Sequence, residues 1–254
     1  MTLETHGLRY RYGEGAEDVI KDLDLLVPAG DHLAIVGPSG GGKSTLALLL
    51  SSVLRPSAGR VVLDGRPLED WAPSERHRAI TVIPQEAYVF TGTVQENLTY
   101  LCPEATTGQV DQAVTVFGLD AAVQRLGGLD ATLPPGGQLL SAGERQLVAL
   151  ARAWLSSASI VVLDEATCHL DSSAEARAEA AFRTRGGTLI VIAHRFGSAL
   201  RAHRALVADG SSWELGTHAE LLTSNSRYRE LYGLSVGTSR RTAMSPKAPA
   251  PVPV

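Results

Sequence analysis

The chain has 254 residues, of which 44% are hydrophobic and 20% are charged, and its formal net charge is −4. This length allows one large domain or two small ones, and the composition is that of a globular protein with a sizeable core. The slight negative charge excludes a general attraction to nucleic acid or anionic lipid. The two cysteines, Cys102 and Cys168, provide neither a disulfide framework nor a metal-binding spacing, which favours a reducing compartment.

No secretory signal opens the chain, because residues 1–7 are polar. The longest apolar stretch, residues 46–54, is interrupted by two serines and is shorter than the roughly 18 residues that a membrane helix requires. If the protein works at a membrane, we therefore expect another polypeptide, or a segment outside this sequence, to supply the spanning part.

The first motif lies between two apolar runs, Leu33–Val36 and Thr45–Leu50, which predict a buried strand and the start of a helix. The residues between them match the phosphate-binding pattern G-x-x-x-x-G-K-[ST], whose glycines let the backbone N–H groups point at one centre. A helix that starts there adds free amide donors and its dipole. We predict that Lys43 reaches the β- and γ-phosphates and that the Ser44 hydroxyl holds Mg²⁺. The predicted nucleotide-binding residues of this stretch are Gly37, Pro38, Ser39, Gly40, Gly41, Gly42, Lys43, Ser44 and Thr45.

A further apolar run, Ile80–Ile83, ends at Pro84 and Gln85. The Gln85 amide oxygen can reach Mg²⁺ or the attacking water. From about residue 86 to residue 154, helical stretches and loops replace the strand patterns, which predicts a helical insertion. Within it, Ser141 followed three residues later by Glu144 predicts a capped helix N-terminus, which can also bind an anion.

Two more apolar runs, Ile160–Leu163 and Leu189–Ile192, also end in polar residues. The first is followed by Asp164, which can order Mg²⁺ directly or through water, and by Glu165, which can orient and deprotonate the attacking water. The second is followed, one residue later, by His194, whose imidazole can contact the γ-phosphate or the water. Solvated carboxylates and an ordinary core or surface histidine are the alternatives, but the nearby phosphate loop favours the catalytic interpretation.

The four short apolar runs, separated by helical patterns, predict an α/β fold with a mainly parallel sheet. Ligands bind at the carboxyl ends of such strands, so we expect the polar residues after all four runs to meet at one edge, where a nucleotide would sit. After Gly237 the sequence is rich in Thr, Ser, Arg, Ala and Pro. We expect residues 1–236 to form one domain and residues 237–254 to be a disordered tail.

This ordered set of motifs resembles the nucleotide-binding domain of ABC transporters over residues 3–233. Residues 37–45 are similar to that family's Walker A motif, residues 160–165 to its Walker B motif with the catalytic glutamate, and residues 140–146 to its LSGGQ signature. The resemblance implies a P-loop NTPase (RecA-like) core, an N-terminal antiparallel β part and a helical subdomain inserted at about residues 86–154. It also implies the roles of single residues: catalysis for Glu165, His194 and Lys43, Mg²⁺ binding for Ser44, Gln85 and Asp164, adenine stacking for Tyr12, the D-loop for Asp171, and contacts to the ATP of a partner domain for Ser141, Ala142, Gly143 and Glu144.

The subtype resembles exporters, because residues 89–98 are similar to their F-S-G-T-I-x-E-N-I stretch and residues 216–222 to their G-T-H-x-E-L-L stretch. The resemblance implies an ATPase that uses ATP and Mg²⁺ to drive a transmembrane permease on the cytoplasmic face of the cell membrane, with export as the expected direction. It further implies a second nucleotide-binding domain, identical or different, and no nucleic acid partner. The permease would be a separate subunit or another part of a longer protein.

Three departures from the family pattern are present: Ala142 replaces a usual glycine, Cys168-His169 replaces a usual Ser-Ala pair, and Pro134-Pro135 replaces the usual glutamate before the signature. Two other classes are alternatives, namely a soluble ABC-class ATPase switch in translation or DNA maintenance and a small-molecule kinase. The sequence has neither a second phosphate loop nor sustained heptads, and the signature at residues 140–146 disfavours a kinase.

Overall fold

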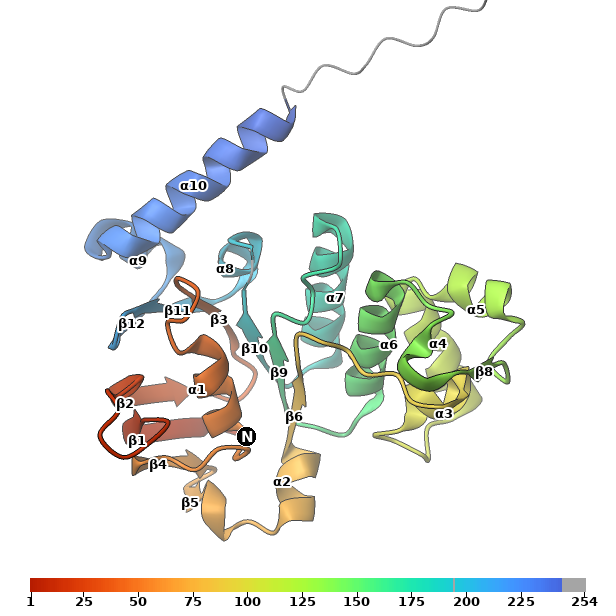
Figure 1. Ribbon diagram of the computed structural model, residues 1–254, viewed down its shortest axis with the longest axis horizontal. Helices are drawn as coiled ribbons and strands as arrows, with labels where there is room; N and C mark the ends of the chain where they lie inside the picture. The colour runs from red at the N-terminus through yellow and green to blue at the C-terminus, as the bar shows by residue number, and fades with distance from the viewer. Residues whose placement is uncertain (194, 244–254) are drawn as a thin grey trace, which may run out of the picture.

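The computed structural model describes residues 1–193 and 195–243 of the chain. Its central element is a six-stranded sheet with the order β12-β11-β3-β10-β9-β6 (Figure 1). Neighbouring strands are parallel except β11 and β12, which form an antiparallel pair at one edge. This confirms the predicted α/β class with a mainly parallel sheet. The strands are β3 His32–Val36, β6 Ile80–Ile83, β9 Ile160–Asp164, β10 Thr188–Ile192, β11 Arg204–Asp209 and β12 Ser212–Gly216.

A second sheet, entirely antiparallel, is formed by N-terminal strands in the order β2-β1-β4-β5. Its strands alternate between buried and exposed residues: in β2, Leu23, Leu25 and Val27 are buried, while Asp24 and Leu26 are exposed. This alternation is typical of a sheet with one face on a core. The antiparallel part that the resemblance implied is therefore present. Its strands are β1 Leu3–Tyr10, β2 Ile20–Val27, β4 Ala58–Leu63 and β5 Arg66–Pro67.

The six-stranded sheet lies between two layers, because successive residues of a strand point to opposite faces. On one face, Val162 and Ile192 belong to a core shared with α1 (Lys43–Leu50) and the N-terminal sheet. On the other face, Val161 and Val191 belong to a core shared with the helices between β6 and β10. Consequently α1 and α6 pack on opposite faces of the sheet.

The segment between β6 and β9 is mostly helical and includes a small two-stranded sheet, β7–β8. It shares one continuous hydrophobic core with residues of β6, β9 and β10, so it is packed directly on the sheet. The elements of this segment are β7 Gly92–Thr93, α3 Val94–Thr99, α4 Thr107–Phe117, α5 Asp120–Leu126, β8 Thr132–Leu133, η2 Pro135–Gly137 and α6 Ala142–Leu155. Before β6 the chain forms η1 Leu68–Asp70 and α2 Pro73–Ala79.

The last helix, α10, runs Ser226–Ala243 and extends away from the sheet (Figure 1). It includes residues 237–243, which belong to the C-terminal segment for which the sequence predicts disorder. After Ser226 the first proline is Pro246, and every residue before it has the backbone N–H that a helix requires. Residues 244–254 lie outside the described residues. The other C-terminal helices are α7 Ser172–Arg185, α8 Gly197–Arg201 and α9 His218–Ser224.

Within the described residues, no helix combines the length and the apolar character that crossing a bilayer requires.

Candidate functional site

The phosphate loop, residues 37–45, leads from β3 into α1 through positions that only glycine can occupy. Gly37 has a φ of 152°, and a Cβ there would lie 2.6 Å from the carbonyl oxygen of Ala208. Gly42 has a φ of 82°, and a Cβ there would lie 2.9 Å from Val19 Cγ1. These conformations and close contacts explain why positions 37 and 42 require glycine. Without side chains there, an anion can approach the backbone N–H groups of the loop.

The Lys43 ammonium is held inside this loop. Lys43 is only 7% exposed, and its Nζ donates hydrogen bonds to the carbonyl oxygens of Pro38 at 2.8 Å and Gly37 at 3.1 Å. Burial lowers the pKa of Lys43, while the negative charges of Glu165 and Asp164 act in the opposite direction. A partly desolvated cation gains from an anion placed beside it, which fits a phosphate group in the loop.

Ser44 and Asp164 join the start of α1 to the carboxyl end of β9. The Ser44 hydroxyl donates a hydrogen bond of 2.8 Å to Asp164 Oδ1. Burial raises the pKa of Asp164, an effect that the Ser44 hydrogen bond and the Lys43 charge oppose and the Glu165 charge reinforces. Among the described residues, no group of three or more His, Cys, Asp and Glu side chains could hold a metal ion by itself. Mg²⁺ usually takes one or two carboxylates with phosphate oxygens and water, so Ser44 and Asp164 fit as the protein's share of such a site.

Tyr12 lies beside the same helix start. Its hydroxyl is 2.8 Å from Thr45 Oγ1, and its ring packs edge-on against Tyr10 with the ring centroids 5.0 Å apart. Tyr12 is nevertheless 67% exposed. An exposed aromatic surface next to a phosphate loop is what stacking on a nucleotide base requires.

Glu165 follows Asp164 in a left-handed backbone conformation, with a φ of 50°, which is uncommon for a residue other than glycine. Its N–H donates to the carbonyl oxygen of Ile192 at the end of β10, at 3.3 Å. The Gln85 side chain, after β6, is exposed, and the Gln85 carbonyl oxygen accepts a hydrogen bond from Gln146 Nε2 at 3.3 Å. The ends of β3, β10, β9 and β6 thus follow one another along one edge of the sheet, as predicted. His194 lies outside the described residues.

The signature residues are at a different place. Ser141 caps α6: its Oγ accepts the Glu144 N–H at 3.2 Å, and the Glu144 carboxylate accepts the Ser141 N–H at 2.7 Å, which confirms the predicted capping box. Ala142 and Gly143 form the first turn of this helix. Helices α6 and α1 pack on opposite faces of the sheet, and among the described contacts Ser141 forms no hydrogen bond with the phosphate loop. Asp171 caps α7, where its Oδ1 accepts two backbone N–H groups at 2.8 Å.

Comparison with known proteins decides the family. A protein-family model described as "ABC transporter" matches residues 20–168, more than half of the chain. The chain belongs to the ABC transporter family. As a nucleotide-binding domain of the exporter-like type, this ABC domain has the P-loop NTPase fold that its motifs implied.

Individual relatives are consistent with this assignment. The ABC domain is 52% identical over 231 residues to the ABC transporter ATP-binding protein RamB of Streptomyces coelicolor, covering 91% of this chain and 38% of that protein. It is 40% identical over 232 residues to the ATP-dependent lipid A-core flippase of Chromohalobacter salexigens, covering 90% of this chain and 40% of that protein. A solved bacterial Atm1-family ABC exporter with ATP bound superimposes with a TM-score of 0.85 at 31% identity, over 97% of this chain and 42% of that one. The chain therefore spans about two fifths of the length of the proteins that it matches.

The sequence motifs assigned no role to two residues of the ABC domain that bond the loops after β6 and β9. Gln146 bonds the backbone of Gln85 and of His169, and Arg195 bonds the carbonyl oxygen of Leu170. Gln146 is the last residue of the signature stretch, and Arg195 directly follows His194, so proximity to a motif was the available signal. The partners themselves are 23 and 25 residues away in the sequence for His169 and Leu170, which no local pattern reveals.

Proposed function

We propose that this ABC ATPase domain hydrolyses Mg²⁺-ATP and thereby drives a transmembrane permease that exports a substrate across the cell membrane. The observation that carries the proposal is the joint placement of Lys43, Ser44 and Asp164 at the carboxyl ends of β3 and β9, beside a loop that only glycines can form. The relatives described as a lipid A-core flippase and an ABC exporter support the transport direction.

In this mechanism the phosphate loop binds ATP through its backbone N–H groups, and Lys43 neutralises charge on the β- and γ-phosphates. Ser44 and Asp164 would hold Mg²⁺, to which Gln85 would add its amide oxygen, and the metal would supply further positive charge to the phosphates. Glu165 accepts a proton from the water that attacks the γ-phosphorus while the bond to the bridging oxygen of ADP breaks. His194, expected at the end of β10, would hold the γ-phosphate in place.

A second nucleotide-binding domain would complete the site. Helix α6 packs on the sheet face opposite to α1, and Ser141 at its N-terminus is exposed, so the signature residues Ser141, Ala142, Gly143 and Glu144 would meet the phosphates of another domain. A 14-residue helix offers unpaired N–H groups and its dipole to an anion. Two such domains facing each other would each bind one ATP between the Lys43 loop of one and the signature of the other.

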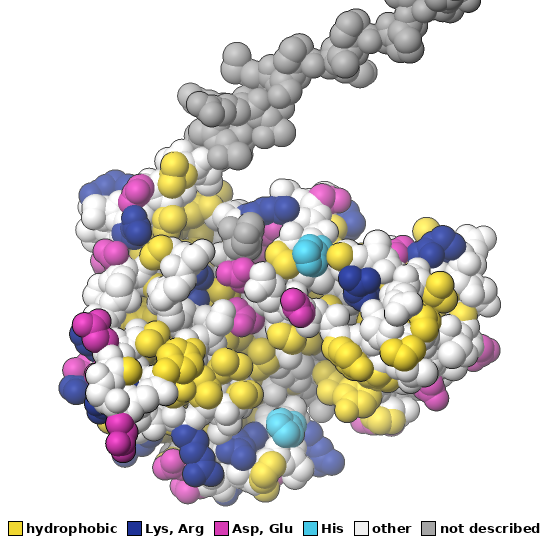
Figure 2. Space-filling view, viewed as in Figure 1, with side chains coloured by type: hydrophobic (Ala, Val, Ile, Leu, Met, Phe, Trp, Pro, Cys, Tyr) yellow, Lys and Arg dark blue, Asp and Glu magenta, His cyan; other side chains and the backbone are white. Residues whose placement is uncertain are grey.

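The permease would dock on the helical part. Tyr88 and Tyr100 are 65% and 62% exposed, and Figure 2 shows hydrophobic side chains gathered in the region of α3. The guanidinium of Arg152 lies 5.0 Å from the Phe90 ring centroid and 5.8 Å from that of Tyr100, which holds these rings in place. Rigid, exposed aromatic groups are typical of protein interfaces. Such docking would place the domain on the cytoplasmic face of the membrane.

The first experiment compares the wild-type chain with Glu165→Gln and Lys43→Ala. Loss of a general base should lower the rate of ATP hydrolysis by about 100-fold or more, while ATP binding, measured by isothermal titration calorimetry, persists. Lys43→Ala should instead lose ATP affinity. Glu69→Gln, an exposed carboxylate on η1, is the matched control. Full hydrolysis by Glu165→Gln would refute the assignment of the base. Recovery of the chain from its native membrane without a polytopic protein would refute the transport proposal.

A further inference from the structure

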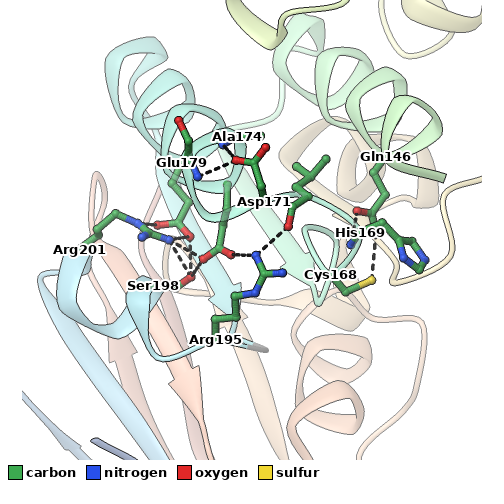
Figure 3. A network of polar contacts seen from close by, with 12 residues as sticks. Gln146, Cys168, His169, Asp171, Ala174, Glu179, Arg195, Ser198 and Arg201 are labelled. Carbon is green, nitrogen blue, oxygen red and sulfur yellow. Dashed lines mark hydrogen bonds and ion pairs between the residues drawn. The ribbon is translucent and has the colours of Figure 1, made fainter. Parts of the chain in front are cut away.

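The β9–α7 loop, residues 165–171, is anchored by two side chains that come from other elements (Figure 3). The first is Gln146 of α6, which is 1% exposed. Its Oε1 accepts the His169 N–H at 2.9 Å, and its Nε2 donates to Cys168 Sγ at 3.1 Å and to the Gln85 carbonyl oxygen at 3.3 Å. Since a glutamine amide has two N–H donors and one carbonyl oxygen, Gln146 uses all its polar groups to hold two loops against α6.

Arg195, between β10 and α8, is the second anchor. Its Nη1 donates to the Leu170 carbonyl oxygen at 2.7 Å and lies 3.4 Å from Glu175 Oε2. Because β9 and β10 are neighbours, this bond joins the segments that follow two adjacent strands. The β9–α7 loop is therefore held from α6 on one side and from the end of β10 on the other.

Arg195 contacts Glu175, which belongs to a buried ionic cluster formed by α7 and α8. Figure 3 shows this cluster beside Arg195. Glu175 and Glu179 are 3% and 0% exposed. Ser198 Oγ, with its single O–H, lies within hydrogen-bond distance of both carboxylates, at 3.0 Å from Glu175 and 2.6 Å from Glu179. Arg201 donates to both, at 2.5 Å and 2.8 Å. Glu175 thus keeps Ser198 and Arg201 as partners when Arg195 is removed, so replacing Arg195 leaves the cluster paired.

The loop that these residues anchor begins with Glu165. The Glu165 carbonyl oxygen accepts the Cys168 N–H at 3.0 Å, and its φ of 50° is a conformation that a non-glycine residue keeps only when its surroundings hold it. The first turn of α6 also packs closely here, because a Cβ on Gly143 would lie 3.3 Å from the His169 carbonyl oxygen. Contacts at residues 168–170 therefore bear directly on the backbone of Glu165.

We propose that Gln146 and Arg195 are positioning residues, which hold the β9–α7 loop so that Glu165 keeps the conformation needed to accept the proton of the attacking water. This inference rests on the proposed function, since it assigns Glu165 as the base. None of the bonds of Gln146 and Arg195 described above is made to the phosphate loop, and Gln146 bonds Gln85 only at its backbone carbonyl oxygen, not at the side chain expected to bind Mg²⁺. Their loss should accordingly reduce turnover and leave ATP binding nearly unchanged.

The test uses Gln146→Met, Arg195→Met and the conservative Arg195→Lys in the full chain. Displacement of a reacting group by about 1 Å can slow a reaction by up to about 100-fold, so we expect the two methionine variants to lower kcat about 10- to 100-fold. The dissociation constant for ATP should change less than about twofold, and Arg195→Lys, which keeps a donor for Leu170, should recover most of the rate.

Arg177→Met is the matched control. Backbone N–H groups of Ala174 and Ser173 hold the pKa of Asp171 below its usual range, and the charges of Arg177 and Arg195 both add to this effect. Arg177, however, bonds only the Ser173 hydroxyl, at 3.0 Å, among the contacts described, and not the loop backbone. The control thus removes a similar charge without removing an anchor, and it should keep the wild-type kcat.

Amide hydrogen exchange of residues 166–171 gives a readout that does not depend on activity. In Gln146→Met and Arg195→Met the amides of Cys168 and His169 should exchange faster than in wild type and in Arg177→Met. Exchange and kcat that both equal those of wild type would overturn the inference. A wild-type chain that hydrolyses no ATP would refute the proposed function instead. In that case, loop exchange in the two methionine variants equal to that of wild type would still overturn the anchoring, and faster exchange would support it.

Discussion

Replacing Arg201 with methionine should strongly destabilise the fold, because it leaves two buried carboxylates without their shared cation. Arg201 Nε lies 2.8 Å from Glu179 Oε2 and its Nη2 lies 2.5 Å from Glu175 Oε1. Hydrogen bonds to Glu179 and Glu175 raise the pKa of Arg201, so the guanidinium stays charged at any accessible pH. In Arg201→Met, Glu179 would keep only the Ser198 hydroxyl as a close hydrogen-bond donor among the described contacts.

The expected loss follows from burial. Removing one partner of a buried ion pair typically costs about 3–5 kcal/mol of the free energy of unfolding. With an unfolding entropy of about 2.1 cal/mol/K per residue, a chain of 254 residues has an entropy of roughly 0.5 kcal/mol/K. The melting temperature should therefore fall by about 6–10 °C.

Circular dichroism at increasing temperature measures this shift, with urea unfolding at 25 °C as a second measurement. The double variant Glu179→Gln/Arg201→Met removes one charge of each sign, and it should regain a large part of the lost stability, because fewer unpaired charges remain buried. A melting temperature within about 2 °C of wild type for Arg201→Met would refute the reasoning, since it would mean that water or another group replaces the guanidinium at no cost.

Two further predictions concern single titratable groups. Burial raises the pKa of Asp164, so the ionised carboxylate destabilises the folded state above that pKa. Without ligand at pH 7.5, Asp164→Asn should therefore have a melting temperature no lower than that of wild type. Differential scanning fluorimetry should also show that the variant has lost the stabilisation that Mg²⁺-ATP gives wild type. Burial lowers the pKa of His32 from 6.5 to about 4, and both its ring nitrogens are buried without a hydrogen-bond partner. Between pH 6.5 and pH 4 the unfolded chain therefore binds a proton at His32 that the folded chain does not bind, so the free energy of unfolding should fall as the pH drops. This fall should be larger in wild type than in His32→Leu by up to about 3 kcal/mol. Equal urea midpoints at pH 7 and pH 5 for wild type, after subtraction of the His32→Leu change, would contradict this.

Much of the fold was predictable because the sequences of buried parallel strands are continuous apolar runs. The runs at 33–36, 80–83, 160–163 and 189–192 all became strands of one sheet, and the carboxyl ends of these strands lie along one edge, since parallel strands share a direction. The phosphate loop was predictable for a different reason, because its conformation admits only glycine at particular positions.

The anchoring of the β9–α7 loop was not predictable in the same way. Glu175 and Glu179 are four residues apart, so a helix places them on one side. The sequence around them is typical of an ordinary charged helix and does not indicate that they are buried. Their partners Ser198 and Arg201 come from α8, which follows another strand. Whether a glutamate in a helix is solvated or buried depends on which helix packs over it, and that is set by the whole fold. The same holds for Gln146, whose partners lie in two separate loops.

The buried cluster is better understood as a device for orientation than as a source of stability. Well-packed apolar residues would hold α7 against α8 at least as firmly as buried charges do, because desolvation offsets most of the attraction between the charges. Apolar residues could not, however, fix Glu175 beside Arg195 so that the guanidinium donates to the Leu170 carbonyl oxygen. Separate readouts follow: Arg201→Met should change mainly the melting temperature, whereas Arg195→Met should change mainly kcat. If both variants lost stability and turnover in the same proportion, the cluster would be a structural element alone, and Glu165 would have to be positioned by its own strand.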